Sequence, residues 1–107
     1  MTTAHNTTLV APISVGELFD KITILRIKSK RITDQAKLSN VNHELQVLER
    51  AAASVPAHEG LPAEIEALLE VNQTLWDIED DIRACERAND FSDTFVQLAR
   101  SVYIQND

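Results

Sequence analysis

Residues 14–32 read SVGELFDKITILRIKSKRI, and this stretch decides the fold class. Its large apolar residues recur at spacings of four, three and seven positions: Leu18, Ile22, Leu25 and Ile32. Such spacings place side chains on one face of an α-helix. Ser14 precedes this pattern as an N-cap, and Glu17 completes a capping box with it. The stretch therefore predicts an amphipathic helix that begins after Ser14.

A second apolar stripe follows, about one residue out of phase with the first: Leu38, Val41, Leu45 and Leu48. Asp34 lies between the two stripes and has the chemistry of a helix N-cap. The sequence favours a kink or short break at residues 33–34, with one continuous helix over residues 14–53 as the alternative. The loop ASVPAHEG, residues 53–60, then ends the helical pattern because it contains Pro56 and Gly60.

Two further helices are predicted after this loop. The first runs from Leu61–Pro62 to about Ala88, since proline is favoured in the first turn of a helix. Its apolar stripe has seven members: Ile65, Leu68, Val71, Leu75, Ile78, Ile82 and Cys85. The last helix begins after Ser92, and its apolar face is Phe95, Leu98, Ala99 and Val102. No stretch alternates as a strand does, so an all-α fold is predicted.

Charge predicts how the long helices pair. Residues 13–38 hold six basic and three acidic residues, a net charge of +3, whereas residues 61–90 hold two basic and nine acidic residues, a net charge of −7. Opposite charges on neighbouring helices favour specific pairing more than they add stability. We therefore expect an antiparallel hairpin of the two long helices, to which a shorter C-terminal helix is added. The stripe of the first is expected to pack on the stripe of the second.

The length and these patterns predict one helical domain over residues 13–107, preceded by a flexible N-terminal tail at residues 1–12. The overall charge of −7 disfavours nucleic acid as a partner, because nucleic-acid binding depends on basic residues. The single cysteine, Cys85, forms no internal disulfide, which favours a reducing compartment. No run is long and apolar enough for membrane insertion and no signal peptide is evident, so a cytoplasmic location is predicted. No cofactor motif is found.

The back of the first helix also carries apolar residues. Ile24 and Ile27 point away from Ile22, onto the face shared with Asp20 and Arg31. Two isoleucines there need a second partner. One interpretation is that the C-terminal helix covers them, and the other is a homodimer in which this face meets its own copy. We expect the homodimer, which would complete the bundle.

A polar line at the edge of the predicted core is the candidate ligand site. Asn72, Glu79 and Glu86 are seven residues apart on the second long helix, and Arg26 and Lys30 lie at the corresponding edge of the first. Such a cluster could bind a small anion, because the basic pair can hold carboxylate or phosphate oxygens. The alternative is a set of salt bridges at the rim of the core.

A metal site is not predicted. Asp77, Asp80 and Asp81 have a spacing that can share magnesium, as in all-α nucleotide pyrophosphohydrolases, but they project away from the apolar stripe and fit a solvated face better. The three histidines have no ligand spacing.

Four segments carry a resemblance to a known family: PISVGELFDKITILRIKSKRI, NVNHELQVLE, LWDIEDDIRACE and FVQLARSVYIQND. Together they resemble a family of small uncharacterised bacterial proteins, a domain of unknown function, over about residues 12–107. The GEL-DKITIL and LWDIEDDIR stretches are the most specific parts. The resemblance implies an all-helical protein without an assigned activity or catalytic residues. Family members commonly continue past Asp107 with a basic helix, so this chain is expected to be a shortened form.

Function is predicted only coarsely. A helical interaction or assembly module, with itself or another protein as partner, fits the patterns better than an enzyme does. A small-anion-binding protein is the alternative. A weaker similarity to all-α chorismate mutases suggests an enzyme whose substrate-binding residues would be Arg26, Lys30, Glu79 and Gln105. The catalytic residues of such an enzyme are not identified by the sequence.

Overall fold

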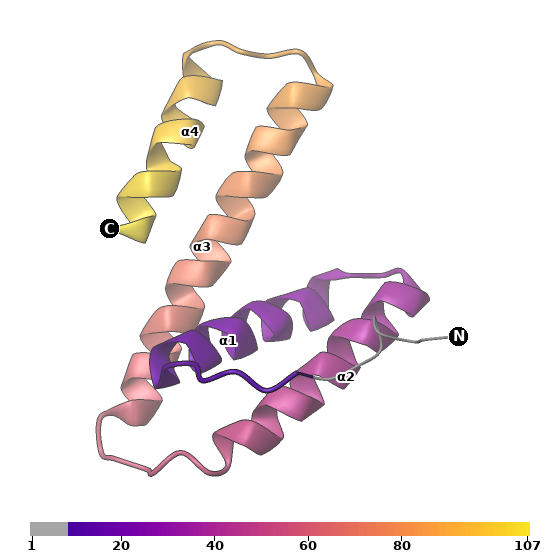
Figure 1. Cartoon of the computed structure of the whole chain (residues 1–107). Helices are drawn as coiled ribbons and strands as arrows, with labels where there is room; N and C mark the ends of the chain where they lie inside the picture. The colour runs from indigo at the N-terminus through magenta and orange to yellow at the C-terminus, as the bar shows by residue number, and fades with distance from the viewer. Residues whose placement is uncertain (1–8) are drawn as a thin grey trace.

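The computed structural model describes residues 9–107, and every regular element in that range is an α-helix (Figure 1). The helices are α1 (Val15–Arg31), α2 (Gln35–Ala52), α3 (Leu61–Arg87) and α4 (Asp93–Asn106). The all-α class is therefore confirmed. Of the predicted tail, residues 1–8 lie outside the described range, and residues 9–12 are exposed and not helical.

The helix ends lie where local sequence signals place them. The backbone N–H of Glu17 donates to Oγ of Ser14 at 3.1 Å. In the same way the backbone N–H of Lys37 donates to Oδ1 of Asp34 at 3.0 Å, so Asp34 caps α2. The favoured break at residues 33–34 is thus confirmed, and residues 14–53 form two helices instead of one. Pro62 lies in the first turn of α3 and Ser92 is the N-cap residue of α4, as predicted.

The four helices form two hairpins, which meet where α1 packs on α3 (Figure 1). α1 and α2 form the first hairpin, and α3 and α4 form the second. α3 has 27 residues and α1 has 17, so α3 is about 40 Å long and α1 about 26 Å. α1 therefore packs along only the first part of α3, and the end of α3 projects beyond it with α4. We call this projecting part, residues 81–106, the arm.

The core is centred on α1. All of the buried residues in the described range belong to this helix: Leu18, Ile22, Thr23, Leu25 and Ile27. Within that range α1 contacts both α2 and α3, whereas α4 contacts α3 alone. A helix that lies between two others buries both faces, which explains why α1 is apolar on two sides.

The predicted partner of the first stripe is wrong. Side chains that contact α3 come from the opposite face of α1, as Asp20 and Arg31 show by their bonds to Asn72 and Asp77. At 100° per residue the stripe that includes Ile22 points away from these residues and toward α2. The charge argument still applies to the opposite face, because Arg31 pairs with acidic residues of α3.

The predicted antiparallel direction of the long helices also needs correction. The start of α1 lies beside the start of α3, where Gly16 and Ile65 line one groove. The end of α1 lies further along α3, where Arg31 pairs with Asp77. α1 and α3 are therefore parallel. The reason is the extra reversal at residues 32–34, which makes α2 the antiparallel partner of α1.

Candidate functional site

A groove of about 340 Å³ lies between α1 and α3. Its lining combines apolar side chains with one basic, one acidic and one amide group: Ile24, Ile27, Lys28, Asn72, Leu75, Trp76 and Glu79. The first three come from α1 and the other four from α3. Apolar walls with a few polar groups between them are the composition of a small-molecule site.

A hydrogen-bonded network fixes Asn72 at one edge of this groove. Its side-chain Nδ2 donates to Oδ1 of Asp20 at 3.0 Å and to Oγ1 of Thr23 at 2.8 Å. The hydroxyl of Thr23 donates in turn to the backbone carbonyl of Asp20 at 2.8 Å, so Oγ1 is free to accept from the amide. Both amide protons are therefore directed at α1, and the carbonyl oxygen of Asn72 is the atom left to accept a hydrogen bond.

Nearby arginines are already paired with carboxylates. Arg31 bonds to Asp77 and lies 3.9 Å from Asp80, and Arg83 lies 2.6 Å from Asp80. Lys28 and Glu79, which line the groove, make no ion pair with any residue in the range 9–107. The groove thus holds one positive and one negative group whose charges no described side chain neutralises.

The structure separates most of the predicted ligand cluster. Arg26 lies on the α2 side of α1, where its Nε is 3.5 Å from Oε1 of Glu49. Lys30 and Glu86 are exposed and do not line the groove. Only Asn72 and Glu79 of the five residues lie together. The salt-bridge alternative is thus observed for Arg26, with a partner on α2 that the sequence did not indicate.

Lys28 is the basic residue of this groove, and the sequence reasoning missed it. Its position was available from the helical wheel, because residues four apart lie on one face and Lys28 follows Ile24 by four. The prediction instead sought basic residues beside the Leu18–Leu25 stripe, which faces α2. The error in helix pairing therefore carried over into the site.

The four residues predicted for a dimer interface do share one face, but that face meets α3 of the same chain. Asp20 and Arg31 bond to α3, Ile27 is only 3% exposed, and Ile24 is partly exposed at the groove. The C-terminal helix, the other predicted cover, does not lie on this face, since α4 has no contact with α1. The apolar back of α1 thus has its partner within the described chain.

The enzyme alternatives gain no assembled site. Gln105 lies on α4, which has no contact with α1, so within one chain it does not meet Arg26 and Lys30. Asp77 and Asp80 pair with arginines. In residues 9–107 no three histidine, cysteine or acidic side chains are arranged to hold a metal ion.

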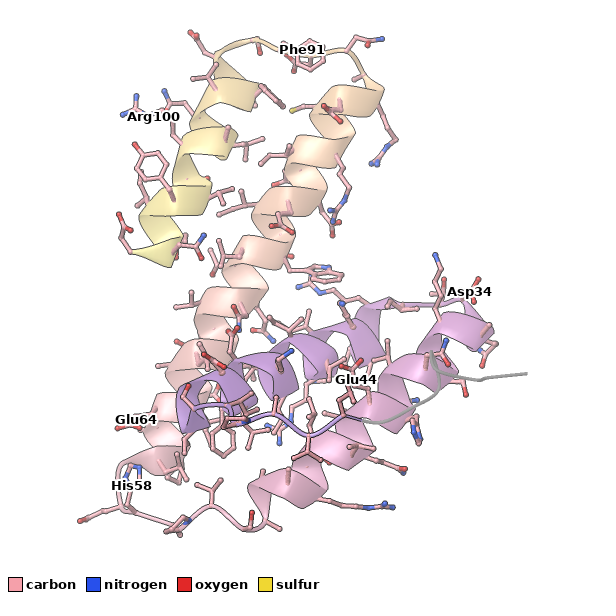
Figure 2. The ribbon with its side chains drawn as sticks, viewed as in Figure 1. Asp34, Glu44, His58, Glu64, Phe91 and Arg100 are labelled. Atoms are coloured by element: carbon pink, nitrogen blue, oxygen red, sulfur yellow. The ribbon has the colours of Figure 1, made fainter. Side chains whose placement is uncertain are left out.

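A second groove, of about 280 Å³, lies where the chain enters α3. It is mainly apolar, with Phe19 of α1 facing Leu61 and Leu68 of α3. His58 and Glu64 stand at its rim, with Nε2 and Oε2 3.8 Å apart, beside the α2–α3 connection (Figure 2). It carries fewer polar groups than the first groove.

Comparison with known proteins adds no assignment. The chain matches no protein-family model, and no curated protein or solved structure matches it at a significant level. Over residues 9–107 none of the helices has the length and apolar character needed to cross a membrane.

Proposed function

We propose that the protein is a helical assembly module that forms a homodimer through the outer face of α4. The observation that carries this proposal is the arm. There α4 packs on α3 with one side, and no other helix of the described chain covers its opposite side (Figure 1). No residue of α3 or α4 is buried, although both helices carry apolar stripes. Two-helix layers of this kind are stabilised when a further layer packs on them.

The outer face of α4 carries an exposed apolar stripe. Val96, Ala99 and Tyr103 follow each other at spacings of three and four, which places them on one side of the helix. They are exposed, whereas Leu98 and Val102 on the other side are half-buried. Figure 2 shows Arg100, the neighbour of this stripe, on the side of α4 that is turned away from α3. We call Val96, Ala99 and Tyr103 the α4 stripe.

The exposed area supports a second copy as the occupant. A compact monomer of 12.0 kDa has an accessible surface of about 6,000 Å², whereas this chain exposes 8032 Å². Its radius of gyration is 17.0 Å, against about 13 Å for a compact chain of this length. Part of the excess comes from the exposed segment 9–14. A standard interface buries about 800 Å² from each partner, and within the described chain α4 contacts α3 alone, which leaves its outer side for a second copy.

Charge also favours self-association at α4. The chain has a net charge of −7, so most of its surface would repel a second copy. α4 carries one acidic and one basic residue, Asp93 and Arg100, and is neutral as a helix. An antiparallel pair of α4 helices would place Val96 against Tyr103 of the second copy. Ala99 would lie near the two-fold axis, where a small side chain allows close approach.

The experiment is a mass measurement in solution by light scattering at micromolar concentration. The unmodified chain is expected at twice 12.0 kDa, and the double variant Val96→Glu, Tyr103→Glu at 12.0 kDa with unchanged helix content by circular dichroism. Val47→Glu is the matched control, because Val47 on α2 is 47% exposed and Val96 is 45% exposed. A monomeric unmodified chain, or a control that dissociates equally, overturns the proposal.

A further inference from the structure

We propose that the groove between α1 and α3 binds a small zwitterion with an apolar body, such as an apolar amino acid or a close derivative. The inference is independent of the proposed dimer, because the α4 stripe and the groove share no residue. It rests on the charges, the fixed amide and the apolar surface that this groove brings together.

The two unneutralised charges stand on opposite walls. Lys28 belongs to α1 and Glu79 to α3, and no ion pair joins them although both line one groove. Exposed basic residues such as Lys30 and Arg100 make no ion pair either, so what distinguishes Lys28 and Glu79 is that they line one groove. A molecule with a carboxylate for Lys28 and an ammonium for Glu79 would satisfy both groups and span the groove.

The fixed amide of Asn72 adds an acceptor on the α3 wall of the groove, two helical turns before Glu79. Its two protons are committed to Asp20 and Thr23, so its carbonyl oxygen remains for a ligand donor. Because Thr23 is fully buried, this orientation is held by the core and not by the solvent-exposed surface. The α3 wall thus offers a carboxylate at Glu79 and, separately, an amide oxygen at Asn72, and a simple anion has no donor for either.

The apolar lining sets the rest of the ligand. Ile24, Ile27, Leu75 and Trp76 contribute branched and aromatic surface between the polar groups. Removing apolar surface from water is favourable by roughly 25 cal/mol per Å², so a ligand with an apolar body gains affinity that a fully polar metabolite lacks. The groove volume of about 340 Å³ is at the small end of the usual range for such sites.

Trp76 provides the readout, because it is the only tryptophan of the chain and lines the groove. We would titrate the full chain with L-leucine, L-methionine and L-phenylalanine and follow the tryptophan emission and the single indole N–H resonance. At least one is expected to give a saturable change at up to millimolar concentrations. For leucine, 4-methylpentanoate lacks the ammonium and 3-methylbutylamine lacks the carboxylate. Each is expected to bind at least about tenfold more weakly, the loss expected from one charged hydrogen bond.

Paired variants assign the charges. Lys28→Gln should remove the preference for leucine over 3-methylbutylamine, and Glu79→Gln should remove the preference for leucine over 4-methylpentanoate. The matched controls are Lys30→Gln and Glu86→Gln, which change exposed charges on the same helices outside the groove. Circular dichroism confirms that each variant is folded.

Three results would overturn the inference. The first is a saturable response to none of the three amino acids. The second is equal binding of leucine and its one-charge analogues, which would mean binding by apolar contact alone. The third is a loss of binding in the control variants as large as in Lys28→Gln and Glu79→Gln, which would place the ligand elsewhere.

Discussion

Asn72 of α3 donates a side-chain hydrogen bond of 2.8 Å to the hydroxyl of Thr23, a residue of α1 with no exposed surface. The same amide reaches Asp20 at 3.0 Å. These bonds join the two helices that the fold brings together in parallel, and they fix the relative position of α1 and α3 along their axes. A shift by one helical turn, about 5.4 Å, would break both.

Asn72→Ala is expected to destabilise the protein by about 1–3 kcal/mol, because it removes both bonds and leaves the acceptor capacity of buried Thr23 unfilled. Chemical denaturation monitored by circular dichroism would measure the loss. Thr74→Ala, two residues further along α3 and exposed, is the control and should change stability by less than ~0.5 kcal/mol. Equal effects of the two variants would show that the network does not hold α1 on α3.

Leu25→Ala is expected to lower the free energy of unfolding by about 2–5 kcal/mol, since Leu25 is buried in α1, the helix that holds all buried residues of the described range. Leu75→Ala should cost less, because Leu75 lines the open groove and is only half-buried. Asp80→Ala should change the free energy of unfolding by ~0–1 kcal/mol, as its pairs with Arg31 and Arg83 are exposed. The order Leu25, Leu75, Asp80 in urea denaturation is the prediction, and any other order contradicts the core assignment.

The connection between α3 and α4 should be sensitive to acid. Hydrogen bonds from the side chain and the backbone N–H of Ser92 hold the pKa of Asp90 below its ordinary value of 3.8. A carboxyl with a lowered folded-state pKa adds stability above its unfolded pKa, and that stability is lost as the pH falls through the folded value. The Ser92 amide resonance should therefore titrate with a midpoint below 3.8. Asp90→Asn should abolish this titration, and a midpoint at or above 3.8 would refute the bond.

Hydrogen exchange should separate the arm from the core. In the Val96→Glu, Tyr103→Glu variant, amides of α4 are expected to exchange faster than those of α1, because α4 contacts α3 alone and buries no residue. In the unmodified chain, protection of α4 should rise with protein concentration while protection of α1 stays constant. Uniform protection in both proteins would mean that the arm does not open on its own.

Much of the secondary structure was predictable from local signals. Ser14, Asp34 and Pro62 mark helix starts through chemistry that acts within one turn. In the structure α1 and α2 begin directly after Ser14 and Asp34, and Pro62 lies in the first turn of α3. Helix phases were equally readable, since the residues of α2 that face α1 are those of its predicted stripe and are half-buried. Such features need only neighbouring residues.

Two of the five residues predicted for the ligand site line the groove. Asn72 and Glu79 were identified from their spacing on one helix, which any helical wheel reproduces. Their partner Lys28 was missed, because a wheel cannot tell which neighbour covers which face. The wrong choice of partner for α1 selected Arg26 and Lys30, which lie outside the groove.

The sequence by itself determined the helical segments, most of their start signals and their amphipathic faces, and it favoured the break at Asp34, because periodicity and capping act over three or four residues. Only the tertiary structure decided how these faces meet. α1 is apolar on two sides, so its sequence is compatible with either neighbour on either side. The reversal after Arg31 brings α2 onto the Ile22 side and leaves the Ile27 side to α3. That choice makes α1 and α3 parallel and places Lys28 across from Glu79. It also leaves α4 beyond the reach of α1, because α3 is longer than the helix that packs on it.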